Sequence, residues 1–413
     1  MSLPDRTAPA SHPQQATFLL RRVVIQDYKS IRHCEVELGP LTFLVGRNGS
    51  GKSNFLDALR FVADSLRTSL DQAIRSRVSP DDIRHQRSGL AVLIDLNFSL
   101  PDQSTVTYEI LIISFSSRSF KVNSERLRIT AESGELLAYY KVTSGKVTKS
   151  SIENPPASQA DRLYLVSASG LPEFRRAYDA LTAMTFYDFN PEAMRSIQAP
   201  DTGESLRRDG SNVASVVARL NDEQPELLDR ITQYIGAIVP GVEKIESISL
   251  GPSETLKFTQ MTGDPLAPHE FYLWNMSDGT LRALGSLVAA FQFAGRGEMV
   301  GLVAIEEPEN SLHPAATAVL MGAFQEAATR TQILITSHSP DLLDKIDLDT
   351  DALLAVALRD GVTNIAPIDK ASLSVIRRQL YTPGELLRMD QLEPDQEDLA
   401  RQSSSTPRSE KKG

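Results

Sequence analysis

GRNGSGKS, residues 46–53, is the stretch of this 413-residue chain that decides the fold. It matches the pattern GxxxxGK[ST], in which glycines turn backbone N–H groups toward phosphates and the following helix presents its positive N-terminus. The apolar run LTFLV (41–45) precedes it, and an amphipathic helical pattern runs from residue 51 to about 66. Strand, glycine loop and helix in this order predict a P-loop nucleotide-binding fold.

The residues of this Walker A loop have separate predicted roles. Lys52 would reach the β- and γ-phosphates of ATP, and Ser53 would ligate Mg²⁺. We therefore predict ATP and Mg²⁺ as the cofactors. The remaining predicted nucleotide contacts in and after the loop are Gly46, Asn48, Gly49, Ser50, Gly51 and Asn54.

A second motif, GLVAIEEPENSLHP (301–314), carries paired carboxylates. A run of small and apolar residues, 301–305, comes directly before Glu306 and Glu307. This order is typical of a central parallel strand with acidic side chains at its carboxyl-terminal end. Glu306 would hold Mg²⁺ through water, and Glu307 would polarise the attacking water. An acidic pair at a helix N-terminus is the alternative, and the presence of the P-loop argues against it.

Two further segments fit the same site. TQILITSHSP (331–340) predicts a buried strand that ends near His338, which would sense the γ-phosphate or serve as a structural histidine. MSDGTLR (276–282) stands before an apolar helix. Ser277 and Gly279 would make an anion-binding helix N-terminus there, or Ser277 or Asp278 would act as an ordinary N-cap.

The composition of the chain excludes several classes of function. The formal net charge is −10, so no overall positive field attracts nucleic acid or anionic membrane, and a nucleic-acid contact needs a local basic patch. Cys34 is the single cysteine, which excludes an intrachain disulfide and a cysteine-rich metal site. We read neither a signal peptide nor a membrane span, and we expect a cytoplasmic protein.

The pattern of apolar residues predicts an α/β fold in five segments. The polar stretches 1–16 and 395–413 would be disordered. A first ATPase lobe, 17–155, would hold the Walker A loop and an antiparallel β subdomain, and 156–241 would be a mainly helical insertion. A second lobe, 242–394, would carry the other motifs on a mixed sheet.

Taken together, the order P-loop, MSDGTLR, IEEPENSLHP, ITSHSP resembles the ABC-type ATPase heads of the SMC, RecF and OLD-like group. IQDYKSIRHCEVELGPLTFLVGRNGSGKSN (25–54) is similar to the N-terminal segment of that group. The resemblance covers about 18–110 and 242–385, and LRRDGSNVASVVARL (206–220) is similar to compact stand-alone members. It implies a homodimer, or a higher oligomer, that sandwiches two ATP molecules, with Ser277 and Gly279 of one copy on the γ-phosphate held by Lys52 of the other.

Several residue roles come from the resemblance alone. His338 would be the switch histidine, His313 would lie in the segment that crosses the dimer interface, and Lys29 would lie near the nucleotide or be a solvated charge. The family signature reads Ser-Gly-Gly where this chain has Ser-Asp-Gly, and Arg282 stands where SMC heads often have an acid.

Two further assignments stay open between alternatives. The resemblance implies a glutamine that contacts Mg²⁺ after the first helix, and either Gln86 or Asn97 would fill that role. Arg207 and Arg208 would form part of a basic groove or pair with Asp209 and Glu204.

OLD-like nucleases carry a C-terminal Toprim domain, and only 75 residues follow His338 here. Asp347, Asp349 and Asp351 are read as a loop that caps a strand, so we expect no built-in nuclease. The first hypothesis is an ATP-gated switch that controls a separate effector protein, DNA or RNA, as in ATPase components of bacterial anti-phage operons. The alternative is a RecF-like DNA-binding ATPase in repair or recombination, which DNA-stimulated turnover with a steep salt dependence would favour.

Overall fold

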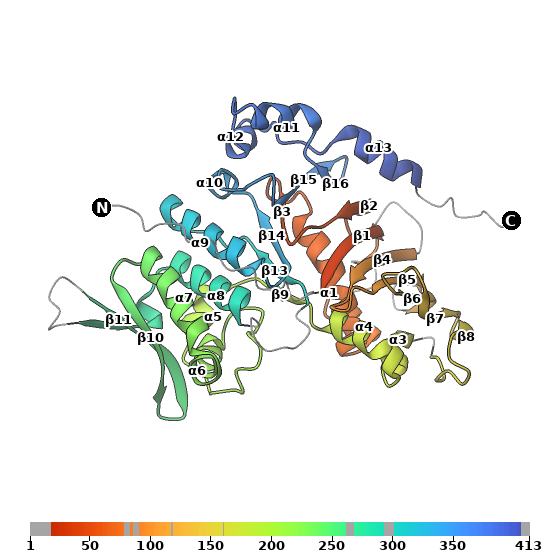
Figure 1. Ribbon diagram of the computed structural model, residues 1–413, viewed down its shortest axis with the longest axis horizontal. Coiled ribbons are helices and arrows are strands. Elements are labelled where there is room, and N and C mark those ends of the chain that lie inside the picture. The colour runs from red at the N-terminus through yellow and green to blue at the C-terminus, as the bar shows by residue number, and fades with distance from the viewer. Residues whose placement is uncertain are drawn as a thin grey trace.

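A six-stranded sheet organises the molecule, in the order β16-β15-β3-β14-β13-β9 (Figure 1). This computed structural model describes residues 18–77, 83–85, 91–116, 119–159, 161–261, 268–292 and 301–405. Five strands are parallel, namely β9 (Thr185–Tyr187), β13 (Val303–Glu306), β14 (Ile333–Ser337), β3 (Leu41–Val45) and β15 (Ala352–Arg359), and β16 (Val362–Pro367) runs antiparallel to β15. The carboxyl ends of the five therefore lie along one edge of the sheet.

Short apolar runs form the centre of this sheet because both of its faces are covered. On one face, Leu44, Ala304 and Leu334 join a core that contains Phe55 and Leu59 of α1 (Lys52–Arg67). The other face packs in a second core with α8 (Asp278–Phe291), α9 (Pro314–Ala327), α6 (Val213–Glu223) and α7 (Pro225–Ile238).

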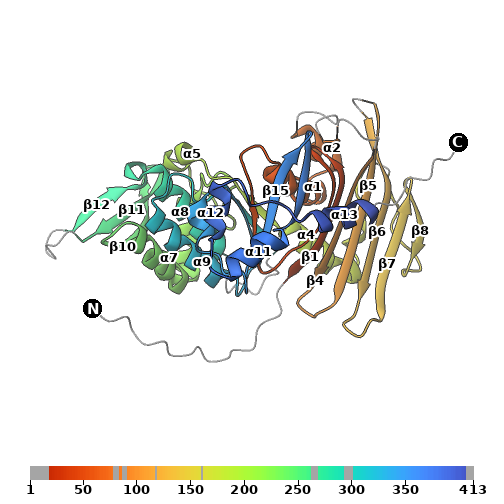
Figure 2. The same ribbon diagram turned by 90° about the horizontal axis from the view of Figure 1, so that it is seen from above.

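An antiparallel sheet of seven strands packs on the outer side of α1. Its order is β2 (Ile31–Glu37), β1 (Leu19–Tyr28), β4 (Ala91–Ser99), β5 (Thr105–Ser116), β6 (Ser119–Thr130), β7 (Leu136–Thr143) and β8 (Lys146–Ser150). Figure 2 shows these strands at the end of the molecule opposite to a smaller sheet of β10 (Val242–Leu250), β11 (Ser253–Gln260) and β12 (His269–Tyr272). The predicted α/β fold, with a mixed sheet and an antiparallel β subdomain, is confirmed.

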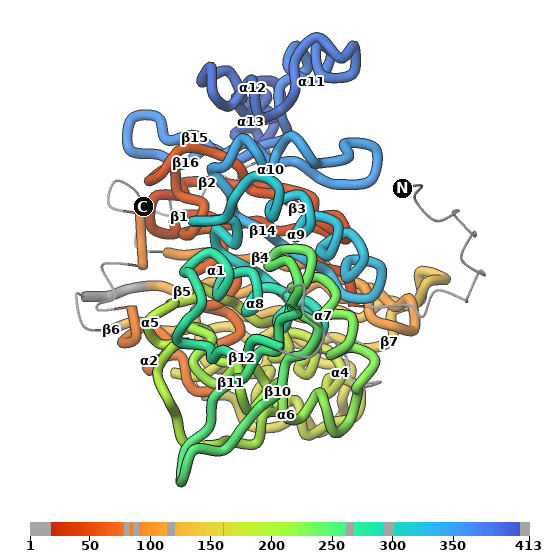
Figure 3. The backbone as a smooth tube through the Cα atoms, turned by 90° about the vertical axis from the view of Figure 1, so that its left-hand side faces the viewer, coloured from red at the N-terminus to blue at the C-terminus, as the bar shows by residue number. Residues whose placement is uncertain are grey.

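Shorter elements complete the chain. They are α2 (Leu70–Arg75), α3 (Tyr164–Ala168), α4 (Pro172–Thr182), α5 (Pro191–Arg195), the 3-10 helix η2 (Leu273–Asn275), α10 (Pro340–Leu343), α11 (Lys370–Arg377), α12 (Pro383–Arg388) and α13 (Gln396–Ser405). Figure 3 shows α11, α12 and α13 together beyond α10 and β15. Within the described ranges, no helix has the length and apolar character needed to cross a bilayer.

The C-terminal segment corrects one expectation. Residues 396–405, predicted as part of a disordered tail, form α13. The side chain of Gln402 is buried, accepts from the backbone N–H of Glu35 at 3.2 Å and donates to the carbonyl of Ile365 at 3.0 Å. Polar contacts with β2 and β16 thus hold a helix whose sequence has almost no apolar periodicity. The disorder predicted for 1–16 and for 406–413 lies outside the described residues.

The predicted helical insertion, 156–241, also needs a correction. It contains α3 to α7, but Thr185–Tyr187 inside it forms β9, the edge strand beside β13. A strand of three residues is too short for a period-two pattern to reveal it. The other predicted segment boundaries stay a prediction.

Candidate nucleotide-binding site

The loop after β3 has the backbone shape that phosphate binding requires. A Cβ on Gly46 would lie 2.1 Å from the carbonyl oxygen of Val356, so only glycine fits against β15. Gly51 has a φ of +104°, and a Cβ there would lie 2.0 Å from Oγ1 of Thr363. These two glycines let the chain turn sharply into α1, which begins at Lys52. The N–H of Asn54 donates to the carbonyl of Gly51 at 3.1 Å, which leaves the N–H groups of Lys52 and Ser53 in the first turn of α1 to an anion.

Lys52 lies folded over its own loop. Its Nζ donates to the carbonyl oxygens of Gly46 at 2.8 Å and Arg47 at 3.1 Å, and only 5% of the residue is exposed. Burial lowers the pKa of Lys52, and the carboxylates of Glu307 and two neighbouring glutamates oppose this shift. The ammonium group therefore lies between the phosphate loop and the acids at the end of β13, and its contact with terminal phosphates stays a prediction.

Ser53 and Glu306 are adjacent at the edge of the sheet. Burial raises the pKa of Glu306, while a hydrogen bond with the Ser53 side chain and the charge of Arg208 lower it. Hydroxyl and carboxylate oxygens are the donors that Mg²⁺ prefers, so this pair fits the predicted ion. Asn54, in contrast, points at Ser30 and donates to its Oγ at 2.6 Å. This bond anchors the start of α1, and nucleotide contact by Asn54 stays a prediction.

The two predicted catalytic side chains face each other. Oε1 of Glu307 lies 3.2 Å from Nδ1 of His338, a close contact without hydrogen-bond geometry, and Oε2 accepts from Nδ2 of Asn310 at 2.7 Å. The backbone of Glu307 has a φ of +44°, an uncommon conformation for a non-glycine residue, and its N–H donates to the carbonyl of Thr336 at 3.0 Å. This backbone hydrogen bond to β14 helps hold the carboxylate of Glu307 beside His338, which follows β14.

Asp188 is a site residue that the sequence analysis missed. It follows β9 and so lies at the same sheet edge as Glu306. Both acids line a cavity of about 310 Å³ together with Ser53 and Lys29. Arg208 bridges the two carboxylates, with Nη2 at 3.3 Å from Asp188 and 3.4 Å from Glu306. No signal in the sequence marks Asp188, because its strand is so short.

The ion pairs that the structure gives for Arg207 and Arg208 join them to other acids than Asp209 and Glu204. Arg208 pairs with Asp188 and Glu306, and Nη2 of Arg207 lies 3.0 Å from Oδ2 of Asp201. Both arginines do line an open hollow that also contains Arg282, so the alternative of a basic groove stays a prediction. The loop returns toward β9 because the N–H of Asp188 donates to the carbonyl of Arg208, and no local pattern predicts such a contact.

Of the two candidates for the residue that contacts Mg²⁺, Gln86 lies outside the described residues. Asn97 is in β4 of the antiparallel sheet, where its Nδ2 donates to Oγ1 of Thr107 at 3.2 Å. It does not line the cavity that holds Ser53 and Glu306. Asn97 is therefore wrong as a site residue, because it lies within β4, where it pairs with Thr107 of β5, and not at a strand end beside the cavity.

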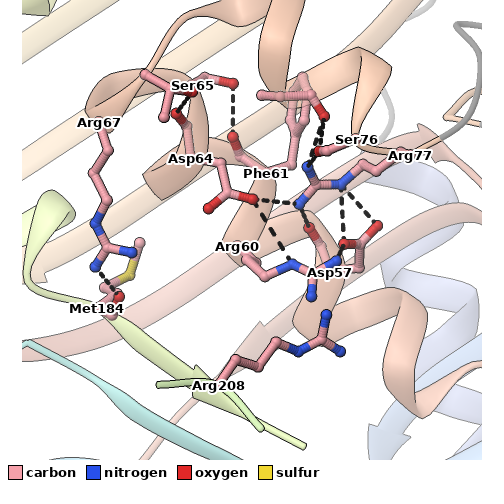
Figure 4. Close-up of polar contacts among 12 residues, drawn as sticks. Asp57, Arg60, Phe61, Asp64, Ser65, Arg67, Ser76, Arg77, Met184 and Arg208 are labelled. Atoms are coloured by element: carbon pink, nitrogen blue, oxygen red, sulfur yellow. Dashed lines mark hydrogen bonds and ion pairs between the residues drawn. The ribbon is translucent and has the colours of Figure 1, made fainter. Parts of the chain in front are cut away.

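Lys29 is an ion-pair partner at the cavity rather than a solvated charge. Its Nζ lies 2.6 Å from Oδ2 of Asp57, which also accepts from the hydroxyl of Tyr28 at 2.7 Å. Arg77, which follows α2, and Arg60 of α1 reach the same carboxylate, at 2.9 and 2.6 Å respectively (Figure 4). Contact between Lys29 and a nucleotide stays a prediction, and it would require Lys29 to leave Asp57.

We expect Asp57→Asn to destabilise the protein by about 3–5 kcal/mol, because it leaves the guanidinium of Arg77 buried without its main counter-charge. Burial opposes ionisation of Asp57, but Arg77 and Lys29 outweigh it and hold the pKa of Asp57 well below its usual range. This stabilisation is present above pH 4 or so and is lost as the pH falls toward the folded-state pKa. Urea unfolding of the original chain and of Asp57→Asn, at pH 7 and at pH 3.5, measures this difference in stability.

Asp71→Asn is the matched control, since it removes an exposed ion pair with Arg75 on the neighbouring helix α2. That change should cost less than about 0.5 kcal/mol. Equal effects of the two substitutions would show that the Asp57 network contributes no more than a surface pair.

The predicted signature lies at the start of α8. Ser277 is its N-cap, with Oγ accepting from the N–H of Thr280 at 3.2 Å, so the capping role is confirmed. A Cβ on Gly279 would lie 2.2 Å from the carbonyl oxygen of Ser311, so glycine is required where α8 meets the segment before α9. Among the described residues, no hydrogen bond or ion pair joins Ser277 or Gly279 to the Walker A loop or to Glu307. Their phosphate contact stays a prediction.

The residues that depart from the family signature contact other residues of the chain. Asp278 pairs with Arg195, which also donates to the carbonyl of Met276 at 2.8 Å, so the extra acid is neutralised within the chain. Arg282 donates to the carbonyl of Phe189 at 2.7 Å. His313 caps α9 by accepting from the N–H of Ala315 at 3.3 Å, and its place in a dimer interface stays a prediction.

The acidic run after α10 forms a capped loop, as predicted. Oδ2 of Asp351 accepts from the N–H of Asp347, and Oδ1 of Asp347 accepts from the N–H of Asp349, both at 3.0 Å. Over the part of the chain that the structure describes, no group of three or more His, Cys, Asp or Glu side chains is arranged to hold a metal ion.

Comparisons with known proteins show the family and the fold to which this site belongs. A family model described as "AAA domain, putative AbiEii toxin, Type IV TA system" matches residues 41–344. The chain is similar to the OLD nuclease of Thermus scotoductus, with 22% identity over 384 residues that cover 89% of this chain and 68% of the relative. It is also similar to the "Retron Vc95 probable ATPase" of Vibrio cholerae serotype O1 biovar El Tor, with 23% identity over 379 residues, 80% of this chain and 72% of the relative.

Among solved structures, the Smc head domain of Pyrococcus furiosus with an extended coiled coil, bound to the C-terminal domain of ScpA, has the same fold. The TM-score is 0.52 at 12% identity, over 88% of this chain and all of the head domain.

Proposed function

Because the chain belongs to the AAA domain, putative AbiEii toxin, Type IV TA system family and is an ATPase with an ABC-type head, we propose that it hydrolyses ATP between two copies of itself. ATP binding would close the dimer, and hydrolysis would open it again. The cycle would act as a switch for a separate effector protein or nucleic acid in the cytoplasm. The likeness to a retron ATPase supports a part in bacterial anti-phage defence.

One observation carries this proposal: the residues suited to hydrolysis gather in one place, and the signature residues lie apart from them. Lys52 and Ser53 meet Glu306, the last residue of β13, and Glu307 at one sheet edge. Ser277 caps a different helix, α8, and Gly279 lies in its first turn. A second copy, related by a two-fold axis, would bring each signature onto the other nucleotide.

The chain's own residues suggest how the reaction would proceed. Lys52 would leave the carbonyls of Gly46 and Arg47 and bind the β- and γ-phosphates. Ser53 and Glu306 would hold Mg²⁺, which when bound neutralises charge on the phosphate oxygens, and Arg208 would release Glu306 as they do so. Glu307, oriented by Asn310 and His338, would polarise the attacking water.

Ser277→Arg tests the composite site. The change should leave ATP binding intact and prevent ATP-dependent dimerisation, because a long cation would occupy the space of the γ-phosphate contact. Light scattering after size exclusion, with and without ATP, measures the dimer, and filter binding measures the nucleotide. Ser69→Arg is the matched control, since Ser69 caps α2 in the same manner and would cost only the capping energy of about 1 kcal/mol.

Normal dimerisation and hydrolysis in Ser277→Arg would contradict the two-copy site. A monomer whose turnover rises several-fold with DNA and falls steeply with salt would favour the RecF-like alternative instead.

A further inference from the structure

A buried carboxylate without an assigned role lies behind the candidate hydrolytic residues. Glu309 belongs to the loop after β13, and only 4% of it is exposed. Its Oε1 accepts a hydrogen bond from the hydroxyl of Ser337 at 2.5 Å. Its Oε2 is buried and has no hydrogen-bond partner among the described residues. Burying an unpaired polar atom costs about 1–3 kcal/mol, so a folding role alone does not account for an acid here.

Ser337 connects this carboxylate to the turn that carries His338. Its hydroxyl donates to Glu309 and accepts from the N–H of Ser339 at 3.0 Å, and the second of these bonds closes the turn around His338. The carbonyl oxygen of Ser337 accepts from the N–H of Gly46 at 3.4 Å. One fully buried serine thus joins the loop after β13, the histidine turn and the first residue of the Walker A loop.

We propose that Glu309 is a positioning residue for ATP hydrolysis, which acts through Ser337 to hold the turn of His338 against Glu307. The proposal rests on the proposed roles of Glu307 and His338. Nδ1 of His338 is 3.2 Å from Oε1 of Glu307, so a small rotation of the turn would separate them. A displacement of about 1 Å in a catalytic group can cost about 100-fold in rate.

The same contacts suggest which substitution the site tolerates. Burial raises the pKa of Glu309 above its ordinary range, although the hydrogen bond from Ser337 opposes the shift. Burial at this position disfavours a charged side chain. Glutamine is neutral and keeps a carbonyl oxygen that can accept from Ser337, whereas alanine removes the acceptor and leaves a cavity.

Steady-state kinetics and thermal unfolding of four variants test the proposal: Glu309→Ala, Glu309→Gln, Ser337→Ala and the double alanine variant. Each alanine variant should lower kcat by ~10- to 100-fold and leave KM for ATP within about threefold. The double variant should be no slower than the slower single variant, because both changes remove one chain of contacts. Glu309→Gln should keep kcat within about threefold of the original chain.

Ser215→Ala is the control, because the Ser215 hydroxyl donates to Glu254 in a buried serine–glutamate pair elsewhere. It should lower the melting temperature and leave kcat unchanged. Multiplicative losses in the double variant, a Gln variant as slow as Ala, or normal kcat in Glu309→Ala would overturn the proposal. If Glu309→Ala does not fold, the kcat values of Ser337→Ala and Glu309→Gln test the proposal instead.

The two proposals can fail separately. If Glu307→Gln hydrolyses ATP normally, the proposed catalytic site is wrong. If Glu307→Gln stalls while Glu309→Ala turns over normally, only the role of Glu309 is wrong.

Discussion

Replacing Lys52 with alanine is expected to abolish ATP binding at ordinary nucleotide concentrations. Lys52 is the buried cation that begins α1 and lies within the electrostatic reach of Glu306 and Glu307. Hydrogen bonds to charged groups contribute about 1.5–3 kcal/mol each, and Lys52 would make at least two with the phosphates. Their loss corresponds to about a 100- to 10,000-fold weaker Kd. Isothermal titration with ATP and Mg²⁺ measures the change directly.

The lost affinity must be separated from a damaged fold. Lys52 donates to the carbonyls of Gly46 and Arg47, so its removal also frees two loop acceptors. Circular dichroism and thermal unfolding should show a folded variant, since both carbonyls can then bond to water. Lys244→Ala, which removes an exposed lysine from β10, is the matched control and should bind ATP normally. Unchanged ATP affinity in Lys52→Ala would rule out the Walker A assignment.

The second large effect is expected from Glu307→Gln. This variant should bind ATP and hydrolyse it about 100- to 10,000-fold more slowly, because an amide does not polarise water as a carboxylate does. A stalled variant should also accumulate the ATP-bound dimer, which light scattering would detect. The shape of the site should persist, since glutamine keeps an oxygen that can accept from Asn310.

Glu306→Gln distinguishes water activation from metal binding. Glu306 adjoins Ser53, so its substitution should weaken Mg²⁺ binding, and raised Mg²⁺ should restore part of the activity. Activity of Glu307→Gln should not respond to Mg²⁺ in this manner. Normal turnover by Glu307→Gln would mean that another group positions the water, and Asp188 would be the first to test because it lines the same cavity as Glu306.

The parts of the site that the sequence predicted are those encoded within short segments. The Walker A loop is a local turn between β3 and α1, and its glycines have the close approaches that the motif demands. Glu306 and Glu307 follow a short, fully apolar run, which is typical of a buried parallel strand. His338 follows a similar run one strand further on, so its position near the acids was also predictable.

The parts that the sequence did not predict depend on contacts between distant segments. Asp188 enters the site because β9, only three residues long, joins the sheet beside β13. The contact of Ser337 with Glu309 spans 28 positions, and neither residue type indicates the other. Helix α13 likewise depends on Gln402 reaching β2 and β16.

The sequence by itself determined that this chain folds around a P-loop and carries the acids and histidine of an ABC-type ATPase, because local spacing encodes a strand, a turn and a helix start. Only the tertiary structure decided that Asp188 and Arg208 share the cavity with Glu306, and that Glu309 lies behind Glu307 and His338. The physical reason is that parallel strands end at one common edge, but which strands become neighbours depends on how their faces pack.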